Sequence, residues 1–325
     1  MNETRNGRDP VIRSWKNANE ETLIQQSRSF SIPLLKLDDR FKVPVMVQYN
    51  LNKTIDTIED STVLDVGEKI DLIKVFCQHL KKDTWSPELR KRMLQVTPQD
   101  ESFVFKNYEH IISLYNTLSK EEKTMSKKWT LEMAEGMCQF LKRVINTPED
   151  LNGYCYYVAG TVGIYLTELL QLKGTNVTEG SFRKLKETAV SFGTFLQKLN
   201  IIRDFIEDND ARKRTFWPQV YFEHEQDLLK ILNKMLDETF NNDLPGAIEY
   251  NTYLPPGNES FEYFIRFILA SGTEYWKMLK DNKAVFSNEK VKLPRTFMTN
   301  LYSRIAALDR EQFAEYCNKY YSQSH

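Results

Sequence analysis

Glycine and proline are scarce in this chain of 325 residues, which contains 12 and 11 of them. A β-sandwich or barrel needs many turns, and turns are rich in both residues. We find no strand-like alternation of useful length, no internal repeat and no low-complexity tract. The scarcity of breakers therefore predicts an all-α protein.

Cysteine and histidine are also few. The four cysteines, Cys77, Cys138, Cys155 and Cys317, are far apart, and no CxxC pair or Cys/His ligand spacing occurs. This argues against the common zinc modules and against a disulfide framework. It predicts isolated thiols in a reducing compartment.

An excess of one charge and a long apolar run are missing as well. Lys plus Arg number 44 and Asp plus Glu 45, a net charge of −1, whereas dedicated nucleic-acid binders usually carry a basic excess. The longest uncharged run, residues 151–167, is shorter than the roughly 20 apolar residues of a spanning helix. The polar start, MNETRNGRDP, does not resemble a secretory signal. We therefore expect a cytoplasmic protein without a nucleic-acid partner.

Apolar residues at helical spacing fill most of the remaining chain. We expect a flexible arm over residues 1–18 and one catalytic domain over residues 19–325. Ser119 and Glu122 have the spacing of a capping box, and Pro148 stands where proline opens a helix. The expected helices cover 20–30, a segment after Pro44, 65–81, 103–118, 120–145, a segment from Pro148, 178–208, a segment after Pro218, 259–281 and two segments near the C-terminus.

The first acidic motif is Asp56-Thr57-Ile58-Glu59-Asp60. On a helix, positions i, i+3 and i+4 share a face, so the carboxylates of Asp56, Glu59 and Asp60 should converge. The second motif is NIIRDFIED, in which Asn200, Asp204 and Asp208 form an i, i+4, i+8 stripe, with Glu207 beside Asp204.

Both acidic motifs have mostly apolar residues between the acids, so these faces should lie near the interior. Acids stacked there without basic partners need a counter-ion. Mg²⁺ binds one or two carboxylates together with substrate phosphates. Two facing stripes could hold a cluster of Mg²⁺ ions against a diphosphate and stabilise it as a C–O bond ionises. The competing interpretation, a solvated helix face with accidental spacing, is weakened because two such motifs occur together.

These motifs resemble those of the squalene/phytoene synthase family, the head-to-head prenyltransferases. Residues 56–60 resemble its first aspartate-rich motif. Residues 193–219, GTFLQKLNIIRDFIEDNDARKRTFWPQ, resemble the second motif and its sequel in the squalene synthase branch. Three further blocks agree in order: Ser27-Arg28-Ser29-Phe30, YCYYVAG from Tyr154 with Val162-Gly163, and Val285-Phe286 with Val291-Lys292-Leu293.

The resemblance implies a class I isoprenoid synthase fold, a single-domain helical bundle with a central cavity. It implies that two farnesyl diphosphates condense head to head through presqualene diphosphate, which NADPH then reduces to squalene. The implied cofactors are Mg²⁺, which Mn²⁺ could replace, and NADPH. A water-insoluble product implies release at a membrane surface, and we expect a monomer.

The resemblance also implies roles for individual residues. Tyr154 would relay a proton or steer a cation, and aromatic faces such as Phe30 suit a carbocation pocket. Arg203 suits bidentate contacts with phosphate. The implied catalytic residues are Tyr154, Asp56, Asp60, Asp204 and Asp208. The implied metal ligands are Asp56, Glu59, Asp60, Asn200, Asp204 and Asp208. The implied substrate-binding residues are Ser27, Arg28, Phe30, Lys53, Gln197, Asn200 and Arg203. Lys292, Arg295 and Asn200 would bind NADPH.

The chain departs from the family pattern at a few positions. Ser61 stands where many relatives have another Asp. In the late segment, Pro294 replaces a common arginine, Arg295 a common lysine and Thr296 a common glycine. The altered late segment favours one alternative, a synthase that stops at presqualene diphosphate or dehydrosqualene. A class I terpene cyclase is a second alternative, because it uses the same acids and metal on one substrate, but the YCYYVAG and Phe216-Trp217-Pro218 blocks argue against it. A non-catalytic relative should have lost its acids, which are intact here.

Gly160 and Gly163 lie one helical turn apart. Glycine inside a helix costs roughly 0.5–1 kcal/mol relative to alanine. The pair therefore indicates the close approach of either a substrate chain or a neighbouring helix, and the sequence leaves both open.

Overall fold

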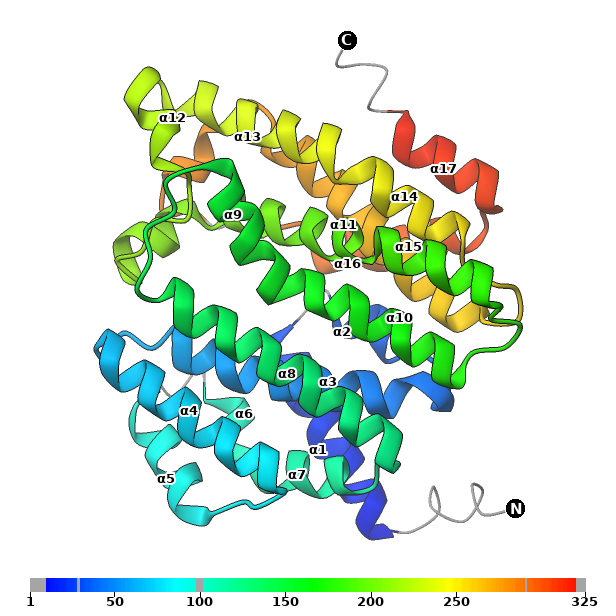
Figure 1. Cartoon of the computed structure of the whole chain (residues 1–325). Coiled ribbons are helices and arrows are strands. Elements are labelled where there is room, and N and C mark those ends of the chain that lie inside the picture. The colour runs from blue at the N-terminus through cyan, green and yellow to red at the C-terminus, as the bar shows by residue number, and fades with distance from the viewer. Residues whose placement is uncertain (1–9, 28–29, 98–101, 290, 320–325) are drawn as a thin grey trace. The chain divides into compact units, whose positions relative to one another are not determined.

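The computed structural model describes residues 10–27, 30–97, 102–289 and 291–319. Within these ranges the regular elements are all helices, and no strand occurs (Figure 1). The prediction of an all-α protein is confirmed. The chain forms two compact units that divide between Lys142 and Arg143. The single catalytic domain over residues 19–325 and its central cavity stay predictions.

The N-terminal unit is built around α3, which contacts α1, α4, α7 and α8. Most of α3 is buried on several faces, including Phe41, Met46 and Ile55. The helices of this unit are α1 (Pro10–Gln26), α2 (Ser31–Leu34), α3 (Asp39–Glu59), α4 (Val66–Lys82), α5 (Pro87–Gln95), α6 (Phe103–Lys106), α7 (Tyr108–Asn116) and α8 (Lys120–Phe140).

Local capping explains where several of these helices begin. The Asp65 side chain accepts a bond from the backbone of Glu68, and Glu68 bonds back to the backbone of Asp65. The same reciprocal box joins Ser119 and Glu122, as the sequence predicts. Such caps satisfy backbone N–H groups that the first helical turn leaves without partners.

Two helices begin earlier than the sequence analysis expects. Helix α1 starts at Pro10, so residues 10–18 of the expected arm are helical, and the arm itself stays a prediction; residues 1–9 lie outside the described part. Proline at the first helical position is favourable because its missing N–H has no helical partner there. Helix α3 starts at Asp39 rather than after Pro44, because Asp38 caps it through the Arg40 backbone N–H.

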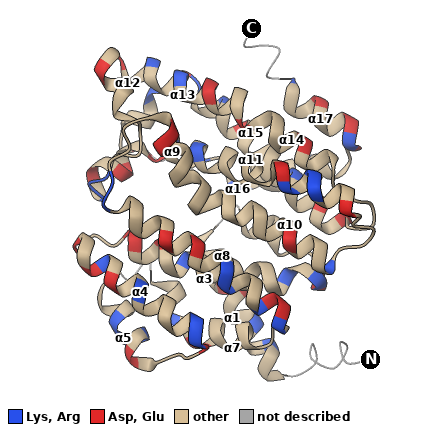
Figure 2. Ribbon diagram, in the orientation of Figure 1, with Lys and Arg blue, Asp and Glu red and all other residues tan. Residues whose placement is uncertain are grey.

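The C-terminal unit is built around α11, which contacts α10, α13, α14 and α15. Figure 2 shows the run from α9 into α10 as largely free of charged residues. The elements of this unit are α9 (Pro148–Cys155), the π-helical turn η2 (Tyr156–Gly160), α10 (Thr161–Lys173), α11 (Glu179–Arg203), the π-helical turn η3 (Glu207–Ala211), α12 (Gln219–His224), α13 (Leu228–Asn242), α14 (Leu244–Thr252), α15 (Glu259–Leu279), the 3₁₀ turn η4 (Lys283–Phe286), α16 (Arg295–Ala306) and α17 (Arg310–Asn318).

Glycines set how closely α11 approaches η2 and α10. A Cβ at Gly163 would lie 2.0 Å from the Ala189 carbonyl oxygen, and a Cβ at Gly193 would lie 2.1 Å from the Ala159 carbonyl oxygen. A Cβ at Gly160 would lie 3.2 Å from side-chain atoms of both Tyr156 and Val190. The neighbouring helix thus accounts for the glycine pair that the sequence left ambiguous.

Helix α11 is shorter than the expected helix over residues 178–208. It begins after Thr178, which forms a capping box with Ser181, and it ends at Arg203. The Trp217 indole N–H donates to the Ile201 carbonyl over 3.3 Å, which satisfies an acceptor in the last turn. The chain then continues through Asp204 into η3. Among the described residues, no helix has the length and hydropathy needed to cross a membrane.

Candidate functional site

The first acidic motif occupies the last turns of α3 in the N-terminal unit. Asp56, Glu59 and Asp60 each offer a carboxylate oxygen, and these oxygens lie within 4.8 Å of one another. Glu59 is buried, whereas Asp56 and Asp60 are partly exposed. The helix stays regular through Asp60, whose N–H donates to the Asp56 carbonyl over 2.9 Å. The predicted convergence of the three acids is confirmed, and the donor set suits a hard divalent cation.

Lys53 lies one turn before these acids, and its ammonium group donates to the Asp56 carboxylate. Burial alone would lower the pKa of Lys53, but the nearby Asp56 and Asp60 carboxylates outweigh it and raise the pKa above its ordinary value. The side chain therefore stays charged. A charged lysine beside a metal cluster can contact a phosphate oxygen as a point charge.

Tyr49 extends this face of α3 and was not singled out from the sequence. Its hydroxyl hydrogen-bonds to Ser27, and its ring stacks on Phe30 with 5.5 Å between centroids. Burial raises the pKa of Tyr49, while Lys53 acts in the opposite direction. The i, i+4, i+7 spacing of Tyr49, Lys53 and Asp56 was the available signal. Arg28, predicted to bind substrate, lies outside the described residues.

Ser61, the departure at the end of the first motif, has a local structural role. Its hydroxyl donates to the Val96 carbonyl over 2.7 Å and accepts from the Val63 N–H over 3.3 Å. It therefore anchors the loop that leaves α3.

The second acidic motif lies at the end of α11 in the C-terminal unit. Arg203 binds Asp204 through two bonds, from Nε to Oδ1 over 2.7 Å and from Nη2 to Oδ2 over 2.5 Å. Its Nη1 donates to Asn200 Oδ1 over 3.0 Å. The guanidinium also lies 5.3 Å from the centre of the Tyr275 ring. Burial opposes the charge on Arg203, but the Asp204 pairing raises its pKa.

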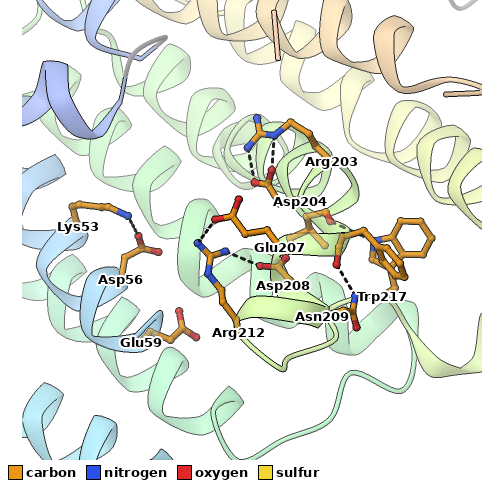
Figure 3. Close-up of polar contacts among 12 residues, drawn as sticks. Lys53, Asp56, Glu59, Arg203, Asp204, Glu207, Asp208, Asn209, Arg212 and Trp217 are labelled. Atoms are coloured by element: carbon orange, nitrogen blue, oxygen red, sulfur yellow. Dashed lines mark hydrogen bonds and ion pairs between the residues drawn. The ribbon is translucent and has the colours of Figure 1, made fainter. Parts of the chain in front are cut away.

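Asp208 and Glu207 share a second arginine, Arg212 (Figure 3). Arg212 Nη1 donates to Asp208 Oδ1 over 2.7 Å, and Nη2 donates to Glu207 Oε1 over 3.2 Å. Burial raises the pKa of Asp208 to about 7 even though Arg212 acts to lower it, and the negative charges of Asp204 and Glu207 add to the rise. The expectation of acids without basic partners is therefore wrong: Lys53 pairs with Asp56 in the first motif, and Arg203 and Arg212 pair with the acids of the second.

Tyr154, the predicted proton relay, is buried in the C-terminal unit. Its ring packs on Phe216 at 4.6 Å between centroids, and the Arg214 guanidinium lies 5.2 Å from the ring centre. The Arg214 backbone N–H donates to the Asp208 carbonyl over 2.9 Å. The segment after η3 thus links Tyr154 to the second motif through Arg214, which the sequence pattern alone did not predict as a site residue.

The late segment packs against the second motif through aromatic rings. Phe286 of η4 lies 5.7 Å from Phe205 and 6.1 Å from Trp217, both edge-on. Phe205 also lines a cavity of about 460 Å³, together with Asn209, Thr215, Gln219, Phe222 and Glu223. Lys292, three residues before α16, and Arg295, its first residue, are both exposed. Gln197 is half-buried on α11, one turn before Asn200.

Comparisons with known proteins agree with these motifs. A profile of the family described as squalene/phytoene synthase matches residues 23–244. Squalene synthase from Rattus norvegicus is 32% identical over 248 residues, which cover 71% of this chain and 56% of that protein. Squalene synthase 1 from Arabidopsis thaliana is 31% identical over 195 residues, which cover 59% and 45%. The chain thus spans about half the length of the curated relatives it matches.

Solved structures show the same relationship. A structure of TcSQS in complex with a ligand has a TM-score of 0.81 and 27% identity, and covers 97% of this chain and 92% of that chain. A dehydrosqualene synthase in complex with a ligand, at 17% identity and a TM-score of 0.61, covers 97% and 100% and shows the shared fold alone. The chain therefore has the expected helical isoprenoid synthase fold, and it belongs to the squalene/phytoene synthase family.

Proposed function

We propose that this chain is a Mg²⁺-dependent squalene synthase. It joins two farnesyl diphosphates into presqualene diphosphate with loss of one pyrophosphate, and then reduces that intermediate with NADPH, with loss of the second. The observation that carries the proposal is the convergence of Asp56, Glu59 and Asp60 beside the charged Lys53. The two curated relatives described above are both named squalene synthase, which supports the same reaction.

The first motif binds the metal and its diphosphate in this proposal. Asp56, Glu59 and Asp60 provide oxygen ligands, as their spacing within 4.8 Å supports. When bound, Mg²⁺ neutralises the diphosphate as the allylic C–O bond breaks. Lys53 contacts a phosphate oxygen, and Ser27 with Phe30 borders the substrate through their contacts with Tyr49. Arg28 is proposed as a further phosphate contact from the sequence pattern alone.

The second motif has a parallel role in the C-terminal unit. Asn200, Asp204 and Asp208 are proposed as metal ligands, and Arg203 as a diphosphate contact held in place by Asp204 and Asn200. Gln197 borders the substrate on the same helix. Arg203 and Arg212 bond to oxygens of these acids, so a cation that takes the same oxygens displaces the arginines.

Tyr154 is proposed to move a proton or to stabilise the cation formed when the diphosphate leaves. Its burial against Phe216 excludes water around the ring, and its face suits a positive charge because the guanidinium of Arg214 already lies over it. A tyrosine hydroxyl with an ordinary pKa of about 10 is a weak base alone. Departing pyrophosphate would accept the proton.

NADPH binding is assigned to the late segment, through Lys292, Arg295 and Asn200. Support comes from the packing of Phe286 against Phe205, which joins this segment to the second motif. Pro294 directly precedes α16 and Arg295 opens it, so the departures from the family pattern fall on a helix start. A monomeric, cytoplasmic enzyme that releases squalene at a membrane surface stays a prediction.

The decisive experiment incubates the purified chain with farnesyl diphosphate and Mg²⁺, with and without NADPH, and identifies the products by mass spectrometry. Squalene formed only with NADPH is the expected result. Presqualene diphosphate or dehydrosqualene in both reactions would instead assign a non-reducing synthase. A cyclic C15 product would assign a terpene cyclase and contradict the proposal.

Lys292→Ala tests the reductant assignment. We expect this variant to accumulate presqualene diphosphate at the expense of squalene, with consumption of farnesyl diphosphate little changed. Lys283→Ala is the matched control, because Lys283 is also an exposed lysine of the late segment. Equal product ratios in the two variants would remove Lys292 from the NADPH site.

A further inference from the structure

Arg212 bridges two carboxylates of the second acidic motif within a single turn. Its two terminal nitrogens reach different acids, Asp208 over 2.7 Å and Glu207 over 3.2 Å. The Asp208 side chain is 6% exposed and the Arg212 side chain 25% exposed, so solvent screens the closer pair only weakly. Arg212 therefore holds a positive charge directly against this buried acid.

The π-helical turn η3 creates the bridge. The Arg212 N–H donates to the Glu207 carbonyl over 3.2 Å, an i→i+5 bond. On an α-helix, side chains three and four positions apart are neighbours, and side chains five apart are not. The wider turn brings Asp208 and Glu207, four and five positions before Arg212, to one side. π-helical turns occur frequently at functional sites.

Arg212 and a divalent cation cannot both bind the same oxygen of the Asp208 carboxylate. Two positive groups about 4 Å apart repel by several kcal/mol even near a protein surface. Asp208 without any cationic partner would be an unpaired buried charge, which is costly. A cation that takes Asp208 Oδ1 must therefore displace Arg212 from that atom.

We propose that Arg212 is an exchangeable internal counter-ion of the second motif. It holds Asp208 and Glu207 while no divalent cation is bound. When a cation takes the Asp208 carboxylate, Arg212 turns away and its planar guanidinium binds the oxygens of the diphosphate, a task for which arginine is well suited. The inference rests on the proposed function, and it adds a coupling between metal and diphosphate binding.

The coupling can be measured without turnover. Mn²⁺ binding to the full chain is followed by calorimetry at pH 8, for the wild type, Arg212→Gln and Lys213→Gln. We expect Arg212→Gln to bind Mn²⁺ at least about five-fold more tightly than the wild type, the lower end of typical couplings. Lys213→Gln removes the same charge from an adjacent, exposed residue and should leave the affinity unchanged.

The second experiment repeats the Mn²⁺ titrations in the presence of inorganic pyrophosphate. Because pyrophosphate itself binds Mn²⁺, that equilibrium is included when the data are fitted. Pyrophosphate should raise the Mn²⁺ affinity of the wild type at least about five-fold more than it raises that of Arg212→Gln. Arg212→Lys keeps the charge but loses the bidentate fork, so it should fall between the two. If Arg212→Gln does not fold, Arg212→Lys takes its place in both Mn²⁺ experiments.

The results separate this inference from the proposed function. If Arg212→Gln and Lys213→Gln bind Mn²⁺ equally and respond equally to pyrophosphate, Arg212 is a structural ion pair and the inference is wrong. The wild-type product assay is independent of that outcome. If the Mn²⁺ affinities change as expected but the wild type forms no squalene, the inference stands and the proposed reaction is wrong.

Discussion

The two acidic motifs hold their carboxylates in opposite ways. Asp56, Glu59 and Asp60 lie together at the end of an uninterrupted helix, with Lys53 as the bonded cation one turn away. In the second motif, the acids lie where α11 gives way to a π-helical turn, and each is bonded to an arginine. In the first arrangement three carboxylate oxygens already lie within 4.8 Å of one another, although Asp56 is also paired with Lys53. The second is neutralised by its own chain and must rearrange before it can bind a metal.

The contrast shows that two motifs with the same kind of acidic side chains can differ in how those side chains are paired before any metal binds. Both motifs have acids at helical spacing, but the first has one lysine bonded to its acids, whereas the second has two arginines. Arg203 adjoins Asp204, and Arg212 follows Asp208 by four positions. The number and kind of nearby cations therefore differ between the motifs, and so does the extent to which the acids are paired.

The largest expected effect separates the motifs by metal affinity. Asp60→Asn should weaken Mn²⁺ binding in the absence of substrate by more than about 100-fold, the upper end of the loss seen when only a supporting partner is removed. Asp204→Asn should weaken it by roughly ten-fold, because Asp204 is already paired with Arg203. Calorimetric titration measures both, with Asp71→Asn, an exposed carboxylate of α4, as the control. Equal losses in the two motif variants would contradict the comparison.

Packing behind the second motif gives the next largest effect. Helix α3 contains no glycine, whereas α11 depends on Gly193 at its contact with Ala159. Gly193→Ala should lower the free energy of unfolding by about 3 kcal/mol, because its Cβ would overlap the Ala159 carbonyl. Urea unfolding measures the change.

Gly180→Ala is the matched control on the same helix. A Cβ at Gly180 would meet only Thr178 Oγ1, 3.9 Å away. This substitution should raise the free energy of unfolding by about 0.5–1 kcal/mol. A destabilisation similar to that of Gly193→Ala would show that the close helix contact is not the cause.

The pH dependence of stability tests the burial of Asp208. Its pKa is raised from 3.8 to about 7 on folding, so between these values the folded protein binds a proton that the unfolded chain lacks. The free energy of unfolding of the metal-free protein should therefore fall as pH rises toward 7, by up to about 1.4 kcal/mol per pH unit from this group.

Asp208→Asn isolates that contribution. Urea unfolding of both proteins in a chelator, from pH 5 to pH 8, should show a smaller decline for the variant. Above pH 8 the difference should become constant, because Asp208 is then ionised in both the folded and unfolded states. Parallel curves throughout would mean that Arg212 keeps the Asp208 pKa near its ordinary value.

The smallest expected effect concerns the end of the first motif. Ser61→Ala removes the bond to the Val96 carbonyl and should cost about 1 kcal/mol of stability. Mn²⁺ affinity should stay the same, because the hydroxyl serves the loop rather than the acidic cluster. Weaker Mn²⁺ binding by Ser61→Ala would assign the hydroxyl a role at the metal.

Much of the local structure could be predicted from the chain alone. The capping box of Ser119 and Glu122, the helix start at Pro148 and the convergence of the first-motif acids all depend on residues within about one turn of one another. Such features need no tertiary information. The family motifs likewise lie in short blocks, which explains why the family could be identified from them.

The errors arise where distant or irregular contacts decide. The sequence predicted one helix to residue 208, but α11 ends at Arg203, where Trp217 satisfies the Ile201 carbonyl. The ambiguity at Gly163 was resolved by the Ala189 carbonyl of another helix. Tyr49 of α3 contacts Ser27 and Phe30, which lie outside that helix, and local spacing could not predict these contacts.

The sequence by itself determined the helical class, the family and the acidic side chains that the proposed chemistry uses, because these depend on residue type and local spacing. Only the tertiary structure decided the state of those side chains. Burial raises the pKa of Asp208, and the π-helical turn brings Arg212 across two acids. Burial and backbone irregularity result from the packing of the whole chain, so a local pattern does not specify them.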